Sequence, residues 1–287
     1  MVSHDPSGFL GSPEMAFCPL FSPNRSMLME NPVVFETIDH IALVTLNRPH
    51  RFNAFDEAYI RLLAERLSTV SRDPHIKGVV LTGAGKAFCA GGDLKALTES
   101  GRPYDETFYN LAAIFHQAIH EIRHMPKPVI AAVNGLSAGG GFSLALSCDF
   151  RIMASSAIMR LAYTSNGLSI DGGGSYSLPR ILGIAKAMEI ATFDRPITAE
   201  QALAWGLVTE VCQDGQAMER ALTMAKNIAQ GALFSFAASK KLIYTSHQTS
   251  LEAQLEKERE YLAACASHPN GQEGINAFME KRDPLYR

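Results

Sequence analysis

The sequence predicts an α/β fold in which alternating strands and helices are followed by a purely helical region. The first observation is that short apolar runs of strand length alternate with longer segments of helical periodicity up to about residue 231. Strands that alternate with helices in this way are typical of an α/β core with short crossovers. The second observation is that every periodic segment after about Ala232 is helical.

The core begins with two β-rich runs and a helix. Residues 33–38 and 41–46 flank Asp39-His40, which predicts a β-hairpin. Residues 56–70 place apolar side chains on one helical face, which predicts a helix packed on the core. These side chains are Ile60, Leu63, Ala64, Leu67 and Val70.

Strands and helices then continue in alternation. Residues 76–82 form a short apolar run, which indicates a buried strand. A long helical pattern starts at Asp105 and ends before Met125-Pro126, because a proline disfavours helical backbone in the residue before it. The remaining elements are a strand over 129–133, a helix over 139–147 and a strand over 150–153.

The helical region contains three patterns, over 234–246, 251–266 and 274–282. Pro269-Asn270-Gly271 is expected to break the chain between the last two. Helices without a sheet to cover must pack on each other, on the core or on another subunit. Region 232–287 is therefore expected to mediate assembly.

Residues 1–32 differ from the rest of the chain. They contain five prolines, show little periodicity and lack the apolar stretch of a signal peptide. The expected division is an irregular extension over 1–32, a core with the functional site over 33–231, and the helical assembly region over 232–287.

Composition and charge exclude several classes of protein. The 26 Lys and Arg against 29 Asp and Glu give a formal net charge of −3, which lacks the basic surface of a nucleic-acid-binding protein. No apolar run reaches the roughly 18 residues that span a bilayer, so no membrane segment is expected. The five cysteines are scattered without paired spacing, which favours reduced thiols in a cytoplasmic protein over disulfides or a zinc site.

Four glycine clusters bear on the chemistry. None shows the G-x-G-x-x-G pattern between a strand and a helix, and no P-loop is present. Residues 135–139 match the G-x-S-x-G nucleophile motif of hydrolases around Ser137. A triad would need a later histidine, and only His247 and His268 follow, both in the helical region. The alternative for Ser137 is a small residue in a crowded turn.

Two glycine-rich turns indicate an oxyanion hole. Residues 85–95 directly follow a buried strand, and their small side chains leave backbone N–H groups exposed. Gly139-Gly140-Gly141 opens a helix, where free N–H groups and the helix dipole attract negative charge. Two such donors from separate turns stabilise the charge that develops on a carbonyl oxygen.

The glycine-rich turns belong to longer runs: AFCAGGDLK, KPVIAAVNGLSAGGGFSLALSCDFRIMA and NGLSIDGGGSYSLPRILG. With ITAEQALAWGLVTEV and GINAFMEKRDPLYR, these runs resemble the crotonase, or enoyl-CoA hydratase/isomerase, superfamily from about residue 33 to the end. The resemblance implies a crotonase-type spiral of ββα units with a C-terminal helical trimerisation region, assembled as a homotrimer or hexamer. It also implies an acyl-coenzyme A substrate, with no further cofactor and no metal.

The resemblance assigns residues to the site position by position. Gly92 and Gly140 supply the two oxyanion N–H groups. The coenzyme A moiety is assigned four neighbours: Ala90, Asp93, Lys95 and Arg48. Arg51 is a second candidate near the phosphates. A solvated surface role is the alternative for the charged residues.

Departures from the family pattern concern the reaction. Hydratases of this family hold water between two Glu residues, whose positions here are Ser143 and Tyr163. Neither side chain is a base near neutral pH. Asp171 stands where isomerases resembling the phenylacetate ring-epoxide enzyme, and dihydroxynaphthoyl-CoA synthases, carry an Asp. Its alternative role is to cap the turn before Gly172.

The expected function is therefore that of an enoyl-CoA isomerase of acyl-CoA or fatty acid metabolism. Asp171 would move a proton between two carbons of an enolate that the oxyanion hole stabilises. An enoyl-CoA hydratase or other lyase, a dihydroxynaphthoyl-CoA synthase-like enzyme and a thioester hydrolase are alternative enzymes. The alternative that is not an enzyme is a family member that binds acyl-CoA without catalysing a reaction.

Two further signals have structural explanations. His116, His120 and His124 recur every four residues, a spacing that can bind metal, but no zinc motif accompanies them. A packed or interface face is expected for these histidines. Cys89 lies in the oxyanion loop and is expected to be a small buried side chain.

Overall fold

The computed structural model describes residue 1 and residues 31–286 of the chain. Residues Pro32–Arg287 form one compact unit, which includes both the expected core and the helical region. The expected N-terminal extension therefore lies almost entirely outside the described residues, and so does Cys18.

The larger sheet has six strands in the order β1-β2-β3-β5-β7-β10. Their bounds are β1 (Val33–Ile38), β2 (Ile41–Leu46), β3 (Gly78–Gly83), β5 (Val129–Val133), β7 (Phe150–Ala154) and β10 (Glu210–Cys212). The expected hairpin is confirmed, because β1 and β2 pair antiparallel around Asp39 and His40, both at positive φ. The other strands pair in parallel, and β3 and β5 are buried along their whole length.

The smaller sheet has four short strands in the order β4-β6-β8-β9. They are β4 (Ala87–Cys89), β6 (Leu136–Ala138), β8 (Ile158–Arg160) and β9 (Ile197–Thr198). Along the chain, β3, β5 and β7 of the larger sheet alternate with β4, β6 and β8 of the smaller one, and each strand pair leads into helices. This repeat is the spiral of ββα units that was expected. Periodicity did not indicate the short strands, because three residues carry no measurable period.

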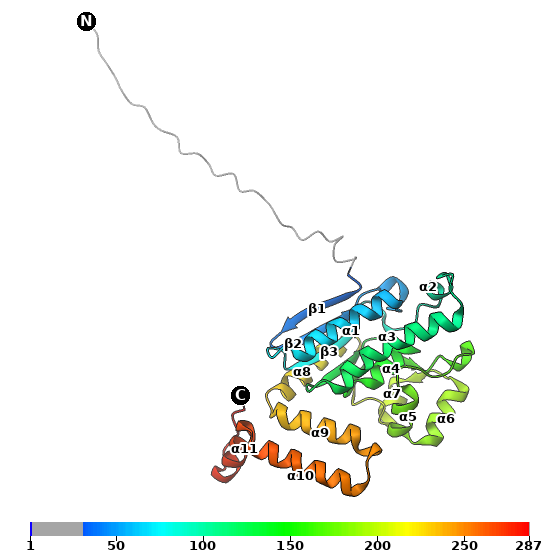
Figure 1. Cartoon of the computed structure of the whole chain (residues 1–287). Coiled ribbons are helices and arrows are strands. Elements are labelled where there is room, and N and C mark those ends of the chain that lie inside the picture. Colours follow the sequence, from blue (N-terminus) through cyan, green and yellow to red (C-terminus); the bar gives the residue numbers. More distant parts are fainter. Residues whose placement is uncertain (2–30, 287) are drawn as a thin grey trace. The chain divides into compact units, whose positions relative to one another are not determined.

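Helices cover the sheets (Figure 1). They are α1 (Glu57–Arg72), α2 (Leu94–Thr98), α3 (Tyr104–His124), α4 (Gly140–Ser147), α5 (Gly174–Leu182), α6 (Ile184–Phe193), α7 (Ala199–Ala204) and α8 (Ala217–Ala229). The Asp56 carboxylate caps α1 by accepting from Tyr59 N, and α1 packs along α3. Among the described residues, no helix is both long enough and apolar enough to cross a bilayer.

Three helices close the chain, and α9 is anchored to the core. They are α9 (Leu233–Thr245), α10 (Leu251–Ser267) and α11 (Pro269–Glu280). The buried Lys240 Nζ of α9 donates to Asp149 Oδ2 at 2.8 Å, and Tyr244 Oη donates to Asp149 Oδ1 at 2.8 Å. Burial lowers the pKa of Lys240, and the adjacent Asp149 carboxylate opposes that shift. These bonds fix the start of the helical region next to α3 and β7.

The expected break at Pro269-Asn270-Gly271 is wrong. His268 alone separates α10 from α11, and Pro269 is the first residue of α11. Proline is favoured at this position because the first helical N–H has no partner in the helix. The His268 ring contributes the cap, since its Nδ1 accepts from Asn270 N at 3.2 Å.

Candidate active site

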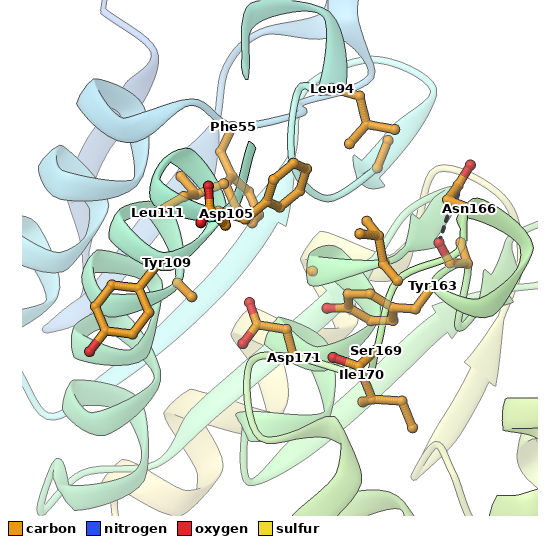
Figure 2. Close-up of a pocket in the computed structure, with 18 residues that line it drawn as sticks. Phe55, Leu94, Asp105, Tyr109, Leu111, Tyr163, Asn166, Ser169, Ile170 and Asp171 are labelled. Atoms are coloured by element: carbon orange, nitrogen blue, oxygen red, sulfur yellow. Dashed lines mark hydrogen bonds between the residues drawn. The ribbon is translucent and has the colours of Figure 1, made fainter. Parts of the chain in front are cut away.

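A cavity of about 410 Å³ lies between α3 and residues 162–171 (Figure 2). Its wall is largely apolar and includes Phe55, Phe108, Leu111, Leu168 and Ile170. Gly92 and Gly140 line the same cavity, and so do the carboxylates of Asp105 and Asp171. The structure thus brings the two predicted oxyanion glycines and the predicted acid together on one surface.

The two segments that were predicted to form an oxyanion hole are in direct contact. Gly91 has a φ of +89°, and a Cβ at this position would lie 2.7 Å from the backbone nitrogen of Gly140. Gly140 is the first residue of α4, so its N–H has no acceptor within the helix. In the described part of the chain, neither the Gly92 N–H nor the Gly140 N–H donates to a protein acceptor. Both groups are available to a ligand oxygen.

The loop that carries Gly92 is held by residues 52–55. Phe55 N donates to Gly91 O at 2.9 Å, and Asp93 N donates to Phe55 O at 2.9 Å. Asn53 is fully buried at positive φ, and its Nδ2 donates to Ala87 O at 2.7 Å. Sequence reasoning missed the role of Asn53. The sequence offered one signal, because asparagine adopts left-handed backbone more readily than most residues. Asparagine occurs in many turns for this reason, so the signal does not single out Asn53.

Asp171 is held at both its backbone and its side chain. Ser143 Oγ donates to Asp171 O at 2.7 Å, and the Asp171 Oδ1 atom lies 2.6 Å from Nε2 of His116. A Cβ on Gly172 or Gly174 would approach Ser143 to 2.9 or 2.8 Å, so this turn packs tightly on residue 143. Ser143 thus supports the turn that presents Asp171.

The side-chain contact of Asp171 differs from a turn cap. In the described residues, the hydrogen-bond partner of its carboxylate is His116, not a backbone N–H of the following turn. The carboxylate points into the space between α3 and residues 162–171 (Figure 2). It is one-third exposed, with a side-chain relative accessibility of 33%. This position leaves Oδ2 free to meet a ligand.

Tyr163 lines the cavity but does not act as a base in this state. Its hydroxyl lies 3.4 Å from Ser143 Oγ, and the residue is buried. Burial raises the pKa of Tyr163, and the hydrogen bond with Ser143 opposes the shift only in part. The hydroxyl therefore stays protonated near neutral pH.

Of the two expected roles, a packed position is wrong for His116, whereas an interface face stays a prediction. Its side chain is half exposed and bonds to Asp171, a residue 55 positions away in the sequence. Nothing in the sequence around His116 points to that partner. His120 and His124 instead lie with their ring centroids 5.6 Å apart. Among the described residues, no three His, Cys, Asp or Glu side chains are grouped as metal ligands.

Three of the four residues assigned to coenzyme A belong to the loop 90–95, whereas Arg48 lies in the segment after β2. Ala90 lines the cavity, and Lys95 is exposed and 3.9 Å from Glu99. Asp93 is buried, caps α2 through Ala96 N and accepts from Arg51 Nη1 at 2.7 Å.

Arg48 is also engaged with the protein. Its Nη1 donates to Asp56 Oδ2 at 2.8 Å, and its Nη2 lies 3.7 Å from Asp93. Arg48 and Asp93 therefore hold the loop and are not freely solvated. Of these cations, Lys95 is the most open, with 73% of its side chain exposed, while Arg51 is 38% exposed and paired with Asp93.

Ser137 and Cys89 are both buried. Ser137 is fully buried, and its Oγ donates to Gly141 O at 3.2 Å, while His268 stacks on Phe234. No hydrolase triad forms around Ser137 in the described residues. Cys89 donates to Asn53 O, and burial raises the pKa of its thiol to about 12. This agrees with its expected role as a small buried side chain.

Comparison with known proteins identifies the family. Residues 36–287 match the family model described as enoyl-CoA hydratase/isomerase. The chain is 36% identical over 248 residues to a 1,2-epoxyphenylacetyl-CoA isomerase of Escherichia coli, covering 86% of this chain and 94% of the relative. It is 32% identical over 253 residues to a short-chain-enoyl-CoA hydratase of Clostridium acetobutylicum, covering 88% and 96%.

A solved structure shows the same arrangement. The crystal structure of an enoyl-CoA hydratase from Polaromonas sp. JS666 superposes with a TM-score of 0.85 at 40% sequence identity, covering 89% of this chain and 99% of that chain. Family match, relatives and fold agree over nearly all of the described residues. The chain belongs to the enoyl-CoA hydratase/isomerase, or crotonase, family.

Proposed function

We propose that the protein is an enoyl-CoA isomerase that shifts a double bond in an unsaturated acyl-CoA thioester. One observation carries this proposal: the carboxylate of Asp171 shares a cavity with the N–H groups of Gly92 and Gly140. Ser143 and Tyr163, at the two glutamate positions of family hydratases, offer no base. Double-bond migration needs one base that moves a single proton, whereas hydration also needs a held and activated water.

The mechanism follows from this arrangement. The thioester oxygen would accept hydrogen bonds from Gly92 and Gly140, which stabilise negative charge on that oxygen better than water does. Asp171 would remove a proton from a carbon next to the double bond, and the electron pair would delocalise to the thioester oxygen. The same carboxyl group would return the proton to the other end of the conjugated system. No atom is gained or lost, so no co-reactant is required.

The coenzyme A moiety would lie along the rim formed by residues 90–95. The Ala90 backbone would face the nucleotide, and Lys95 and Arg51 would reach its phosphates. Arg48, which is paired with Asp56, and Asp93, which is paired with Arg51, would support this rim. The acyl group would occupy the apolar part of the cavity between Phe108 and Ile170.

A panel of acyl-CoA thioesters tests the proposal. Incubation with 3-enoyl-CoA, 2-enoyl-CoA and ring-derived unsaturated CoA esters, followed by mass spectrometry, distinguishes an isomer of unchanged mass from addition of one water and from free acid. We expect conversion of a 3-enoyl or ring-derived ester without mass change, and little addition of water to crotonyl-CoA. Fast hydration would favour the hydratase, free acid the thioester hydrolase, and carbon–carbon ring closure the dihydroxynaphthoyl-CoA synthase-like enzyme. Tight binding without any turnover would favour an inactive acyl-CoA-binding member.

We further propose that the helical region mediates assembly into trimers or hexamers. Leu251, Leu255 and Leu262 lie on one face of α10, and all three are exposed. Phe278 of α11 is 81% exposed, and the neighbouring Met279 is exposed as well. Monomers rarely leave so much apolar surface in water, so a second copy is the expected partner.

Light scattering coupled to gel filtration checks the assembly. We expect a mass of three or six chains at micromolar concentration, and a shift toward monomer in Leu262→Glu combined with Phe278→Glu. Glu258→Gln, a change of a charged residue on α10, serves as the control. A monomeric wild-type protein at this concentration contradicts the proposal.

A further inference from the structure

We propose that His116 is a positioning residue for Asp171, a role that rests on the proposed function of Asp171 as the base. His116 belongs to α3, and Asp171 lies in the segment that follows β8, so the pair joins two walls of the cavity. Their Nε2–Oδ1 distance of 2.6 Å is that of a short, charge-assisted hydrogen bond. This contact fixes the side chain of Asp171 in one orientation.

The direction of the hydrogen bond follows from the chemistry of the two groups. An ionised carboxylate has no proton to give, so the Nε2 atom of His116 must carry the hydrogen. In the described residues, Nδ1 of His116 has no hydrogen-bond partner, and His116 also lines a second, larger cavity of about 780 Å³. With the hydrogen on Nε2, Nδ1 of the neutral ring is an acceptor. His116 therefore contacts both the proposed base and the second cavity.

The hydrogen bond assigns different tasks to the two oxygens of Asp171. Oδ1 is occupied by His116, and Oδ2 remains to take the proton of the substrate. The backbone of Asp171 is fixed separately, because Ser143 Oγ donates to its carbonyl at 2.7 Å. Because both the backbone and the side chain of Asp171 are held, the carboxylate loses little orientational entropy when it reacts. A base oriented by a third group is a recurring arrangement in enzymes.

The neighbouring aromatic side chains on α3 make other contacts, so His116 is the residue of this helix that orients Asp171. The buried Phe115 ring lies 6.5 Å from the His116 ring and confines it on one side. His120, one turn further along α3, makes its ring contact with His124. His120 lines the same larger cavity and makes no hydrogen bond to Asp171, so it provides a matched control.

The experiment compares His116→Leu, His116→Gln and His120→Leu with the wild-type enzyme on the thioester found active in the panel. His116→Leu removes the donor, and we expect kcat to fall about 10-fold with KM changed less than about 3-fold, since misorientation affects the chemical step. Glutamine carries an amide donor at a similar reach, so His116→Gln is expected to retain most of kcat. His120→Leu is expected to leave both constants unchanged.

Combination with Asp171→Asn separates this inference from the proposed function. If His116 acts through Asp171, adding His116→Leu to Asp171→Asn lowers kcat no further. A large effect of Asp171→Asn together with an unchanged kcat in His116→Leu overturns the role of His116 alone. An unchanged kcat in Asp171→Asn overturns the proposed base itself.

A measurement in the resting enzyme keeps the inference testable without turnover. The imidazole nitrogen signals of His116, identified by their loss in His116→Gln, report its tautomer by nuclear magnetic resonance. We expect the hydrogen on Nε2, and a changed signal in Asp171→Ala. A hydrogen on Nδ1 with Nε2 unprotonated contradicts the proposed hydrogen bond.

Discussion

Replacing Asp171 by asparagine is expected to lower turnover by about 10²-fold or more, the loss that follows removal of a general base. The amide has nearly the same shape as the carboxylate and can still accept from His116, so the loop and the fold should be retained. Because the substitution leaves the N–H groups of Gly92 and Gly140 unchanged, thioester binding should change little. Steady-state kinetics on a 3-enoyl-CoA, with calorimetric binding of the same ester to the variant, measures both quantities.

Asp105 offers a matched control for this substitution. Asp105 lines the same cavity but lies in the first turn of α3. There its negative charge interacts favourably with the positive end of the helix dipole. Asp105→Asn removes an equal charge from the cavity and is expected to leave turnover within about 2-fold of the wild type, the usual scale of surface substitutions. Equal losses in the two variants would mean that general electrostatics, and not a base at residue 171, drives the reaction.

Replacing Gly140 by proline is expected to lower turnover by about 10²- to 10³-fold, the effect of losing one oxyanion donor. Proline has no N–H, and it is tolerated in the first turn of a helix, where Gly140 lies. Circular dichroism and thermal unfolding would check that the variant folds. The decrease should appear in kcat, since the donor acts on charge that develops in the reaction.

Two alanine variants separate the N–H group from steric effects. A Cβ at residue 140 would lie 2.6 Å from the Phe55 ring, so Gly140→Ala retains the N–H but displaces that ring. A Cβ at residue 92 would meet Leu97 and Leu111 at 3.5 and 3.6 Å, which is ordinary contact, so Gly92→Ala should be nearly silent. The excess loss of Gly140→Pro over Gly140→Ala measures the hydrogen bond. Without such an excess, Gly140 would not be an oxyanion donor.

The sequence by itself determined the long elements and the position of the two glycine-rich turns. The hairpin 33–46, the helices α1 and α3 and the buried strands were predictable, because each has a hydrophobic period that its own residues define. The two glycine-rich turns were visible in the sequence, and the family resemblance assigned Gly92 and Gly140 within them; the structure places both residues on one cavity. The family motifs then added Asp171 as the candidate base.

Only the tertiary structure decided how these residues are supported. The bond between His116 and Asp171 joins side chains 55 residues apart, and it exists because α3 and the loop after β8 form opposite walls of one cavity. Asn53 holds the oxyanion loop through contacts more than 30 residues distant. Periodicity records which side of a segment is buried, but not which distant segment covers it. Packing between helices, strands and loops decides which distant residues come into contact, so contacts such as that of His116 with Asp171 are seen only in the folded chain.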